Sequence, residues 1–128
     1  MGLYDMIMIK DNHVDYAGGI PNAIDRVEKY LKDNKKKLSI VCEVRNFNDI
    51  ETALNTGRVD RIMLDNFTIE ETRNAVRYIN GRLPVESSGG ITLEELRAYA
   101  KCGVDFISVG ALTHQISSLD LSLKATDF

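Results

Sequence analysis

The sequence of 128 residues lacks several features that mark whole classes of proteins. It has no basic excess, because 16 lysine and arginine residues stand against 19 acidic ones and give a formal net charge of −3. This balance argues against a nucleic-acid-binding protein. No apolar run approaches the roughly 20 residues that cross a membrane, so we expect no membrane partner. The first residues show no basic segment followed by a long apolar one, so we expect no signal peptide.

Cysteine and histidine are scarce as well. Cys42 and Cys102 form neither a CxxC pair nor a disulfide framework, so we expect a reduced, cytoplasmic chain without a zinc site. By strand parity, Cys42 points toward the helices and is expected to be inert packing. His13 and His114 lie too far apart in sequence to argue for a transition-metal site.

The sequence does contain a regular alternation of strand-like and helix-like segments. Such strands, separated by helices, predict βαβ units and a parallel sheet. Thr68 and Thr92 each have a glutamate three residues later, which predicts a helix start at each. Pro21 suits the first turn of another helix, and Asn34 is expected to end it in the left-handed conformation. The buried stripe of that helix is expected to be Ile24, Val27 and Leu31. The predicted strands are residues 5–10, 38–44, 61–65, 84–88 and 105–109.

Polar residues gather at the carboxyl ends of these strands. Lys10, Glu43, Asp65 and Ser88 occupy these positions, on the face opposite to an apolar, largely β-branched one. In (β/α) barrels, and in open doubly wound sheets, ligands bind beyond the carboxyl ends of the strands. The alternative is a structural cluster of ion pairs inside a barrel. A complete barrel needs eight strands and about 250 residues, so five strands predict an open sheet or a partial barrel that belongs to a longer protein.

Two glycine-containing segments follow the last two predicted strands. Ser88-Gly89-Gly90 precedes a predicted capped helix, and residues 110–114 follow the next strand. Glycine lets the backbone approach a ligand, and the amides of a helix N-terminus attract anions, so the pair predicts a phosphate site. Plain turns are the alternative.

Two further groups of residues near strand ends carry possible chemistry. Lys10 offers a cation for a carboxylate or phosphate group, whereas the residues 11–13 that follow it fit either a functional role or a plain loop with Asx-type turns. Glu43 and Asp65 are hard oxygen donors that suit Mg²⁺ brought in by a phosphorylated substrate.

Six segments in this order resemble the quinolinate phosphoribosyltransferase family, and the resemblance spans essentially the whole chain. They are Met1-Gly2-Leu3-Tyr4-Asp5, Ile9-Lys10-Asp11-Asn12-His13, Cys42-Glu43-Val44, Ile62-Met63-Leu64-Asp65-Asn66, Ser88-Gly89-Gly90-Ile91 and Ser108-Val109-Gly110-Ala111-Leu112-Thr113-His114. The resemblance implies a transferase of NAD biosynthesis. That enzyme converts quinolinate and phosphoribosyl pyrophosphate, with Mg²⁺, to nicotinate mononucleotide, pyrophosphate and carbon dioxide. It also implies a homodimer or higher homo-oligomer for the full-length protein.

The same resemblance implies a fold and a role for each matching residue. Residues 1–128 would be the C-terminal part of a type II phosphoribosyltransferase-like α/β barrel, with an N-terminal sandwich domain and the first barrel strands absent. Lys10 would meet the anionic substrates, and Glu43 and Asp65 would face the ribose, the metal and the developing positive charge. The phosphate-binding residues would be Ser88, Gly89 and Gly90 in one loop and Gly110, Leu112 and His114 in the other.

The sequence also departs from the family pattern. The family has a His-Arg pair just before the segment that matches Met1, with further basic residues upstream, and none is present. We therefore expect the chain to be inactive by itself. Two alternatives stay open: another phosphate-binding barrel, such as a thiamine-phosphate or tryptophan-pathway enzyme, and a non-catalytic half-barrel that assembles with another chain through its sheet edges.

Overall fold

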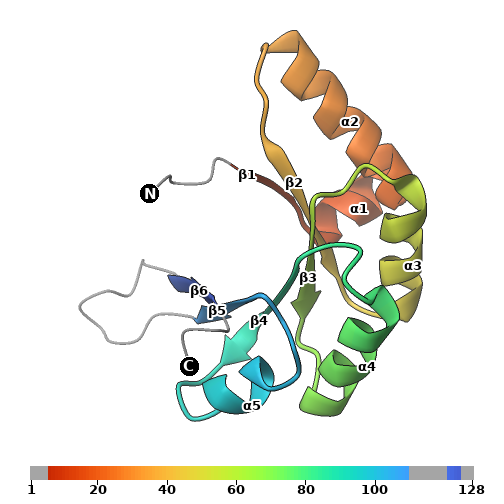
Figure 1. The fold of residues 1–128 in the computed structure, drawn as a ribbon. Coiled ribbons are helices and arrows are strands. Elements are labelled where there is room, and N and C mark those ends of the chain that lie inside the picture. Colours follow the sequence, from red (N-terminus) through yellow and green to blue (C-terminus); the bar gives the residue numbers. More distant parts are fainter. Residues whose placement is uncertain (1–5, 110–120, 125–128) are drawn as a thin grey trace. The chain divides into compact units, whose positions relative to one another are not determined.

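The computed structural model describes residues 6–109 and 121–124. The chain divides into two compact units, Met1–Ile62 and Met63–Phe128, and each is described by itself. The first unit contains β1 (Met6–Ile9), α1 (Asp11–Ala17), α2 (Ile20–Asp33), β2 (Ser39–Val44) and α3 (Phe47–Thr56), and β3 (Arg61–Asp65) begins in it and ends in the second unit (Figure 1). The second unit then contains α4 (Ile69–Ile79), β4 (Val85–Ile91), α5 (Leu96–Ala100), β5 (Phe106–Val109) and β6 (Leu121–Lys124).

Both units are built from neighbouring parallel strands. In the first unit, β1 pairs with β2 in a register that places Ile7 beside Ile40 and Ile9 beside Cys42. In the second, β4 pairs in parallel with β5, and β5 pairs antiparallel with β6. Within each unit the strands follow one another in the sheet in the order of the chain. The five predicted strands are thus confirmed, and β6 is an antiparallel addition that the sequence pattern did not indicate.

In both units, an aspartate that precedes one strand forms hydrogen bonds with a residue near the start of the strand before it. In the first unit, the Ile40 amide donates to the Asp60 carboxylate at 2.7 Å, and the Asp60 amide donates back to the Ile40 carbonyl at 2.8 Å. In the second, the Val85 amide donates to the Asp105 carboxylate at 2.9 Å, and the Asp105 amide returns a 2.8 Å bond to Val85. Each pair spans 20 residues of sequence. The two units therefore close their βαβ arches with the same pair of hydrogen bonds.

Removing either carboxylate is expected to destabilise the chain. In Asp60→Ala or Asp105→Ala, a backbone amide at a strand start loses a charged acceptor, which costs about 1–3 kcal/mol of unfolding free energy. Urea unfolding followed by circular dichroism measures the change. Asp33→Ala, at an exposed position near the end of α2, is the control and should change the free energy by less than about 0.5 kcal/mol. Equal effects from all three variants would contradict the prediction.

The core of each unit lies between its strands and helices. Of the predicted α2 stripe, Ile24 is fully buried and Leu31 nearly so, but Val27 is only half-buried. The left-handed residue after α2 is Lys35, with φ 52°, whereas the C-cap residue Asn34 has φ −98°. The helix thus ends at Asn34 as predicted, whereas the left-handed conformation expected for Asn34 and the burial expected for Val27 are wrong. The apolar side chains buried most fully are Ile9, Ile24, Ile50, Ile62, Leu64, Ile79 and Ile107.

One of the two predicted helix starts is confirmed, and the other lies later in the chain than predicted. Thr68 caps α4 as expected, because its hydroxyl accepts from the Glu71 amide while Glu71 accepts from the Thr68 amide. Thr92 makes the same exchange with Glu95, but α5 begins only at Leu96, so the capping pair precedes that short helix. Among the described residues, no helix combines the length and apolar character needed to cross a membrane.

Two serines of the second unit allow a matched test of how much a hydrogen-bond partner for a serine hydroxyl contributes to stability. The buried Ser87 hydroxyl has no hydrogen-bond partner among the described residues, whereas the Ser108 hydroxyl donates to the buried Glu86 carboxylate. Ser87→Ala is therefore expected to leave the free energy of unfolding unchanged or to raise it by up to about 1 kcal/mol. Ser108→Ala should lower it by about 1.5–3 kcal/mol. Urea unfolding of both variants checks the prediction, which fails if Ser87→Ala is the more damaging.

Candidate active site

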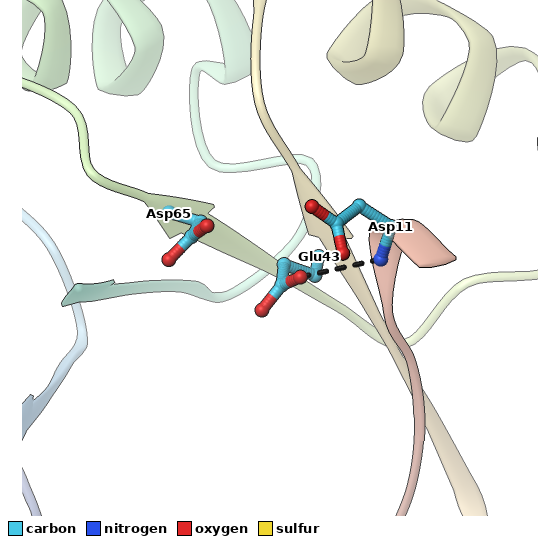
Figure 2. A group of neighbouring side chains, drawn as sticks. All are labelled: Asp11, Glu43 and Asp65. Carbon is cyan, nitrogen blue, oxygen red and sulfur yellow. Dashed lines mark hydrogen bonds between the residues drawn. The ribbon is translucent and has the colours of Figure 1, made fainter. Parts of the chain in front are cut away.

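Glu43 lies at the carboxyl end of β2, where the first turn of α1 meets it. The amide of Asp11, the first residue of α1, donates to the Glu43 carboxylate at 3.2 Å, as Figure 2 shows. This bond forms because α1 starts directly after β1, the parallel neighbour of β2. A charged acceptor at a helix N-terminus is favourable, since the first amides have no partner within the helix. Glu43 is thus held at the position that the strand pattern predicted.

Lys10 occupies the N-cap position of α1. Its backbone is extended, with φ −88° and ψ 161°, and its side chain is exposed. His13 reaches back one turn, and its Nδ1 accepts from the Lys10 amide over a long 3.5 Å. Residues 11–13 therefore start a helix, so the alternative of a plain loop is wrong, and a functional role for these residues stays a prediction. Because Ile9 pairs with Cys42 in the sheet, the next residues, Lys10 and Glu43, occupy neighbouring register positions. The exposed Lys10 side chain can meet an anion from solvent.

A second carboxylate, which the sequence reasoning did not assign, lies next to Glu43. Carboxylate oxygens of Asp11 and Glu43 come within 4.8 Å of each other, and both residues are half-buried. Two hard oxygen donors at this spacing fit Mg²⁺, which is bound through one or two carboxylates with water and substrate phosphates. Asp11 lies two residues after the end of β1, and this position near a strand end is the signal that could have found it. The strand alternation that predicted Glu43 does not reach Asp11, because Asp11 begins a helix.

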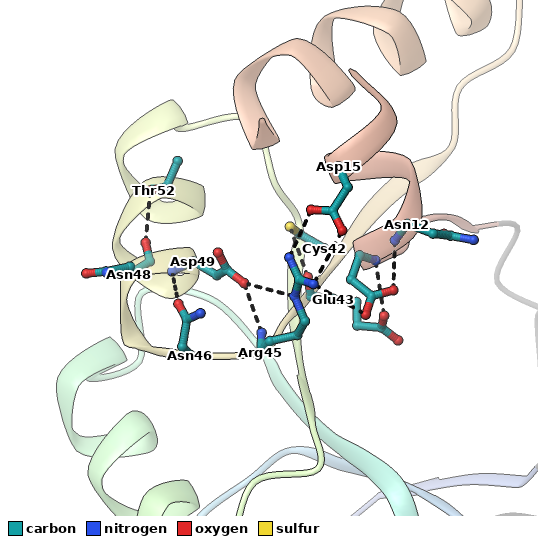
Figure 3. Close-up of polar contacts among 10 residues, drawn as sticks. Asn12, Asp15, Cys42, Glu43, Arg45, Asn46, Asn48, Asp49 and Thr52 are labelled. Atoms are coloured by element: carbon teal, nitrogen blue, oxygen red, sulfur yellow. Dashed lines mark hydrogen bonds and ion pairs between the residues drawn. The ribbon is translucent and has the colours of Figure 1, made fainter. Parts of the chain in front are cut away.

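Arg45 connects the elements around this carboxylate pair (Figure 3). Its guanidinium lies 3.2 Å from Asp15 and 3.8 Å from Asp11, both on α1, and 3.8 Å from Asp49 on α3. The Asp49 carboxylate also accepts from the Arg45 amide at 3.0 Å. Single exposed ion pairs contribute little, but a network on one arginine restrains the elements it joins. Arg45 therefore helps to fix the start of α1, where the Asp11 amide holds Glu43.

In the second unit, the end of β3 meets the glycine pair of β4. Asp65 is the last residue of β3 and is half-buried. Asn66, which follows it with a positive φ of 58°, donates its amide to the Ser88 carbonyl at 3.1 Å. Its side chain and amide also lie against Gly89 so closely that a Cβ on Gly89 would come within 2.5 Å of Asn66 Oδ1. Asp65, Ser88 and Gly89 are therefore brought together through Asn66, a residue to which the sequence reasoning gave no role.

The glycine pair is part of a strand and does not form a loop that leads into a helix. β4 continues to Ile91, which pairs with Val109, and the register shifts between Ser87 and Ile91. Gly89 and Gly90 supply the extra residues of this irregularity with φ of 98° and 76°. A Cβ on Gly90 would meet none of the described residues within 4 Å, so the described part of the chain leaves this glycine open. The expected loop that leads directly into a capped helix is wrong, because β4 runs through both glycines to Ile91 and α5 starts only at Leu96. The predicted phosphate site at these glycines stays a prediction.

The remaining predicted residues fall into two groups. Gly110, Leu112 and His114 lie outside the described residues. Cys42 is fully buried, and burial, with the nearby Asp49 and Glu43 carboxylates, raises the pKa of its thiol to about 12. Burial also raises the pKa of the Cys102 thiol. Both cysteines are free, and Cys42 is packing, as expected.

Comparisons with known proteins agree on one family. The model of the quinolinate phosphoribosyl transferase C-terminal domain matches residues 1–124. The chain belongs to the quinolinate phosphoribosyltransferase family. It is 42% identical to the chloroplastic nicotinate-nucleotide pyrophosphorylase [carboxylating] of Arabidopsis thaliana over 97% of this chain and 40% of that protein. A mitochondrial quinolinate phosphoribosyltransferase [decarboxylating] of Nicotiana tabacum is 40% identical over 97% of this chain and 39% of that protein.

Solved structures confirm the fold of the family. The nicotinate-nucleotide pyrophosphorylase of Francisella tularensis matches with a TM-score of 0.73 and 41% identity, over 88% of this chain and 38% of that one. The Ehrlichia chaffeensis enzyme matches with a TM-score of 0.75 and 38% identity, over 89% of this chain and 40% of that one. The predicted fold class is confirmed, and the match decides against the other phosphate-binding barrels. This chain spans about 40% of the length of its quinolinate phosphoribosyltransferase relatives.

Proposed function

We propose that this chain supplies the phosphoribosyl-binding part of a quinolinate phosphoribosyltransferase. The reaction of the whole protein would join quinolinate to phosphoribosyl pyrophosphate and give nicotinate mononucleotide, pyrophosphate and carbon dioxide. The observation that carries the proposal is the family match over residues 1–124, and the positions of Lys10, Glu43 and Asp65 at strand ends support it. Turnover is proposed to require the part of the relatives' length that this chain does not match, so residues 1–128 alone are proposed to bind without catalysing.

The proposed chemistry follows from the charges at the strand ends. As pyrophosphate leaves, positive charge builds on the ribose ring. Carboxylates fixed before the reaction, such as Glu43 held by the Asp11 amide, stabilise that charge without having to reorganise. Asp65 is proposed to act in the same way from the end of β3. The exposed Lys10 ammonium would bind an anionic group of the substrates.

Binding of the substrate's phosphate groups is assigned to the backbone of β4 and to a metal ion. Gly90 borders open space, so a phosphate oxygen can approach the chain there, with Ser88 and Gly89 beside it. Mg²⁺ would be held by Glu43, as predicted, and by its neighbour Asp11, while Asp65 stays a metal ligand predicted from the sequence. When bound, the ion neutralises the charge that develops on the departing pyrophosphate.

Ligand binding tests the proposal directly. Calorimetry of the purified chain with phosphoribosyl pyrophosphate and Mg²⁺ is expected to show binding, whereas quinolinate alone should give no heat because its two carboxylates need basic side chains from the rest of the protein. Glu43→Gln should weaken the binding about tenfold, a loss of roughly 1.4 kcal/mol. Glu51→Gln, at an exposed position on α3, is the matched control. Absence of binding to the unaltered chain, or equal losses in both variants, would argue against the site.

We also propose a compartment and an oligomeric state for the whole protein. The free, buried cysteines are compatible with a reducing compartment such as the cytoplasm, although the plant relatives carry chloroplastic or mitochondrial names. A homodimer or higher homo-oligomer is proposed for the full-length protein. Fractionation of cells and sedimentation of the full-length protein test these two points.

A further inference from the structure

A buried carboxylate on β4 lies just before the glycine pair of that strand. Glu86 is 3% exposed and stands two residues before Ser88. The half-buried hydroxyl of Ser108, on the neighbouring strand β5, donates to the Glu86 carboxylate. A hydrogen bond from a hydroxyl to a carboxylate is one of the strong kinds, and a carboxylate that is removed from water depends on such donors. The chemistry proposed above gives neither Glu86 nor Ser108 a task.

The register between β4 and β5 brings this hydrogen bond to the proposed phosphate site. Between the partners of Ser87 and Ile91, β5 has one residue, Ser108, whereas β4 has three, residues 88–90. The two extra residues make β4 bulge out of the regular ladder, and this bulge, residues 88–90, contains the glycine pair. In an unbroken ladder Ser108 would stand beside Ser88, but its hydroxyl instead reaches back to Glu86. The bond therefore joins the two strands where the bulge begins.

The other side of the bulge is held from the end of β3. The Asn66 amide donates to the Ser88 carbonyl at 3.1 Å, and Asn66 lies against Gly89. A Cβ on Gly90, by contrast, would meet no atom of the described chain within 4 Å. The bulge is thus anchored toward β3 by Asn66 and toward β5 by the bond of Ser108 with Glu86. A backbone that is fixed before a ligand arrives loses less conformational freedom on binding.

We propose that Glu86 and Ser108 are positioning residues that hold the bulge in the conformation that binds a phosphate group. Their hydrogen bond keeps Ser108 turned toward Glu86, so that Ser108 does not pair with Ser88 and β4 keeps its two extra residues at the glycines. Without the hydroxyl, the end of β5 can shift along β4 and change the bulge. The inference rests on the proposed function, because its ligand is the pyrophosphate group of phosphoribosyl pyrophosphate.

Calorimetry of the 128-residue chain with inorganic pyrophosphate and with phosphoribosyl pyrophosphate, each with Mg²⁺, tests the proposal. Ser108→Ala is expected to weaken the binding of both compounds about tenfold. Ser108→Thr keeps the hydroxyl and should weaken it less than threefold. Glu86→Gln keeps an acceptor but loses the charge, so its effect should lie between those two. Adding Glu86→Gln to Ser108→Ala should weaken binding no further, because two residues that act through one hydrogen bond are not additive.

Asp105→Ala separates positioning of the bulge from a general loss of stability. The Asp105 carboxylate accepts from the Val85 amide at 2.9 Å, at the amino ends of the same two strands. Its removal is therefore expected to destabilise the same pair of strands at the end away from the bulge. Under conditions where every variant is folded, Asp105→Ala should change the affinity less than twofold. In nuclear magnetic resonance spectra, the amide signals of Gly89 and Gly90 should move in Ser108→Ala and stay in place in Asp105→Ala.

Unchanged affinity in Ser108→Ala would overturn the proposal, and so would an equal loss of affinity in Asp105→Ala, because the role would then be only structural. If Ser108→Ala does not fold, Glu86→Gln takes its place, and unchanged affinity in that variant would overturn the proposal as well. Failure of the proposed function gives a different result, since the unaltered chain would then bind neither compound. The glycine amide signals decide in that case: signals that stay in place in the variant refute the positioning of the bulge, and signals that move support it.

Discussion

Gly89→Ala is expected to lower the free energy of unfolding by about 2–5 kcal/mol and to remove binding of phosphoribosyl pyrophosphate. Two physical costs combine at this position. A φ of 98° is a backbone conformation that alanine adopts only with strain of about 1–2 kcal/mol. The new Cβ would also lie 2.5 Å from Asn66 Oδ1 and 2.6 Å from the Asn66 backbone nitrogen, so the chain after β3 would have to move, which costs about 1–3 kcal/mol more.

Gly90→Ala is the matched control for that variant. Gly90 also has a positive φ, 76°, but a Cβ there would meet no atom of residues 6–109 or 121–124 within 4 Å. Only the conformational cost remains, about 1–2 kcal/mol. Urea unfolding gives the stabilities, and calorimetry gives the affinity for phosphoribosyl pyrophosphate with Mg²⁺. If the two alanine variants were equally stable, close contact with Asn66 would not be the reason for glycine at position 89.

The Cys42 thiol is expected to react with iodoacetamide at least about a thousandfold more slowly in the folded chain than an exposed cysteine does at pH 8. The thiolate is the reacting form, and a rise in pKa from 9.0 to about 12 lowers its population by about three powers of ten. Complete burial of the side chain adds a barrier to access.

Mass spectrometry of labelled peptides separates the two cysteines of the chain. Cys102, which is 7% exposed, serves as the internal comparison and should be labelled faster than Cys42. In concentrated urea the two should react at similar rates, because the causes of the difference are then lost. Rapid labelling of Cys42 in the folded chain would show that the end of β2 opens frequently.

Much of the fold could be predicted because the strands have strong local signals. The segments that became β2 and β3 are apolar runs bounded by polar residues, and the capping pair of Thr68 and Glu71 marks the start of α4 by itself. The ends of strands also followed from alternation, which placed Glu43 and Asp65 correctly at carboxyl ends. These features depend on a few adjacent residues and need no knowledge of distant contacts.

The errors arose where tertiary contacts decide the local conformation. The first residues of helix α1, Asp11-Asn12-His13, are polar and in sequence are typical of a loop. The first amide of the helix donates to Glu43, 32 residues away. The glycine pair reads as a loop, but Ile91 pairs with Val109 and extends β4 through it. Asn66 and Arg45 were missed as site residues, and Asp11 was left between a functional role and a plain loop, for the same reason, since their roles come from contacts between elements.

The paired hydrogen bonds of Asp60 with Ile40 and of Asp105 with Val85 bear on how the chain acquires its structure during synthesis. Each pair closes a segment of 20 residues that contains one helix. The entropy lost on closing such a short segment is small compared with that of joining distant parts of the sequence. Each arch can thus form as soon as its own aspartate has left the ribosome, one strand at a time, before the remaining strands have been made.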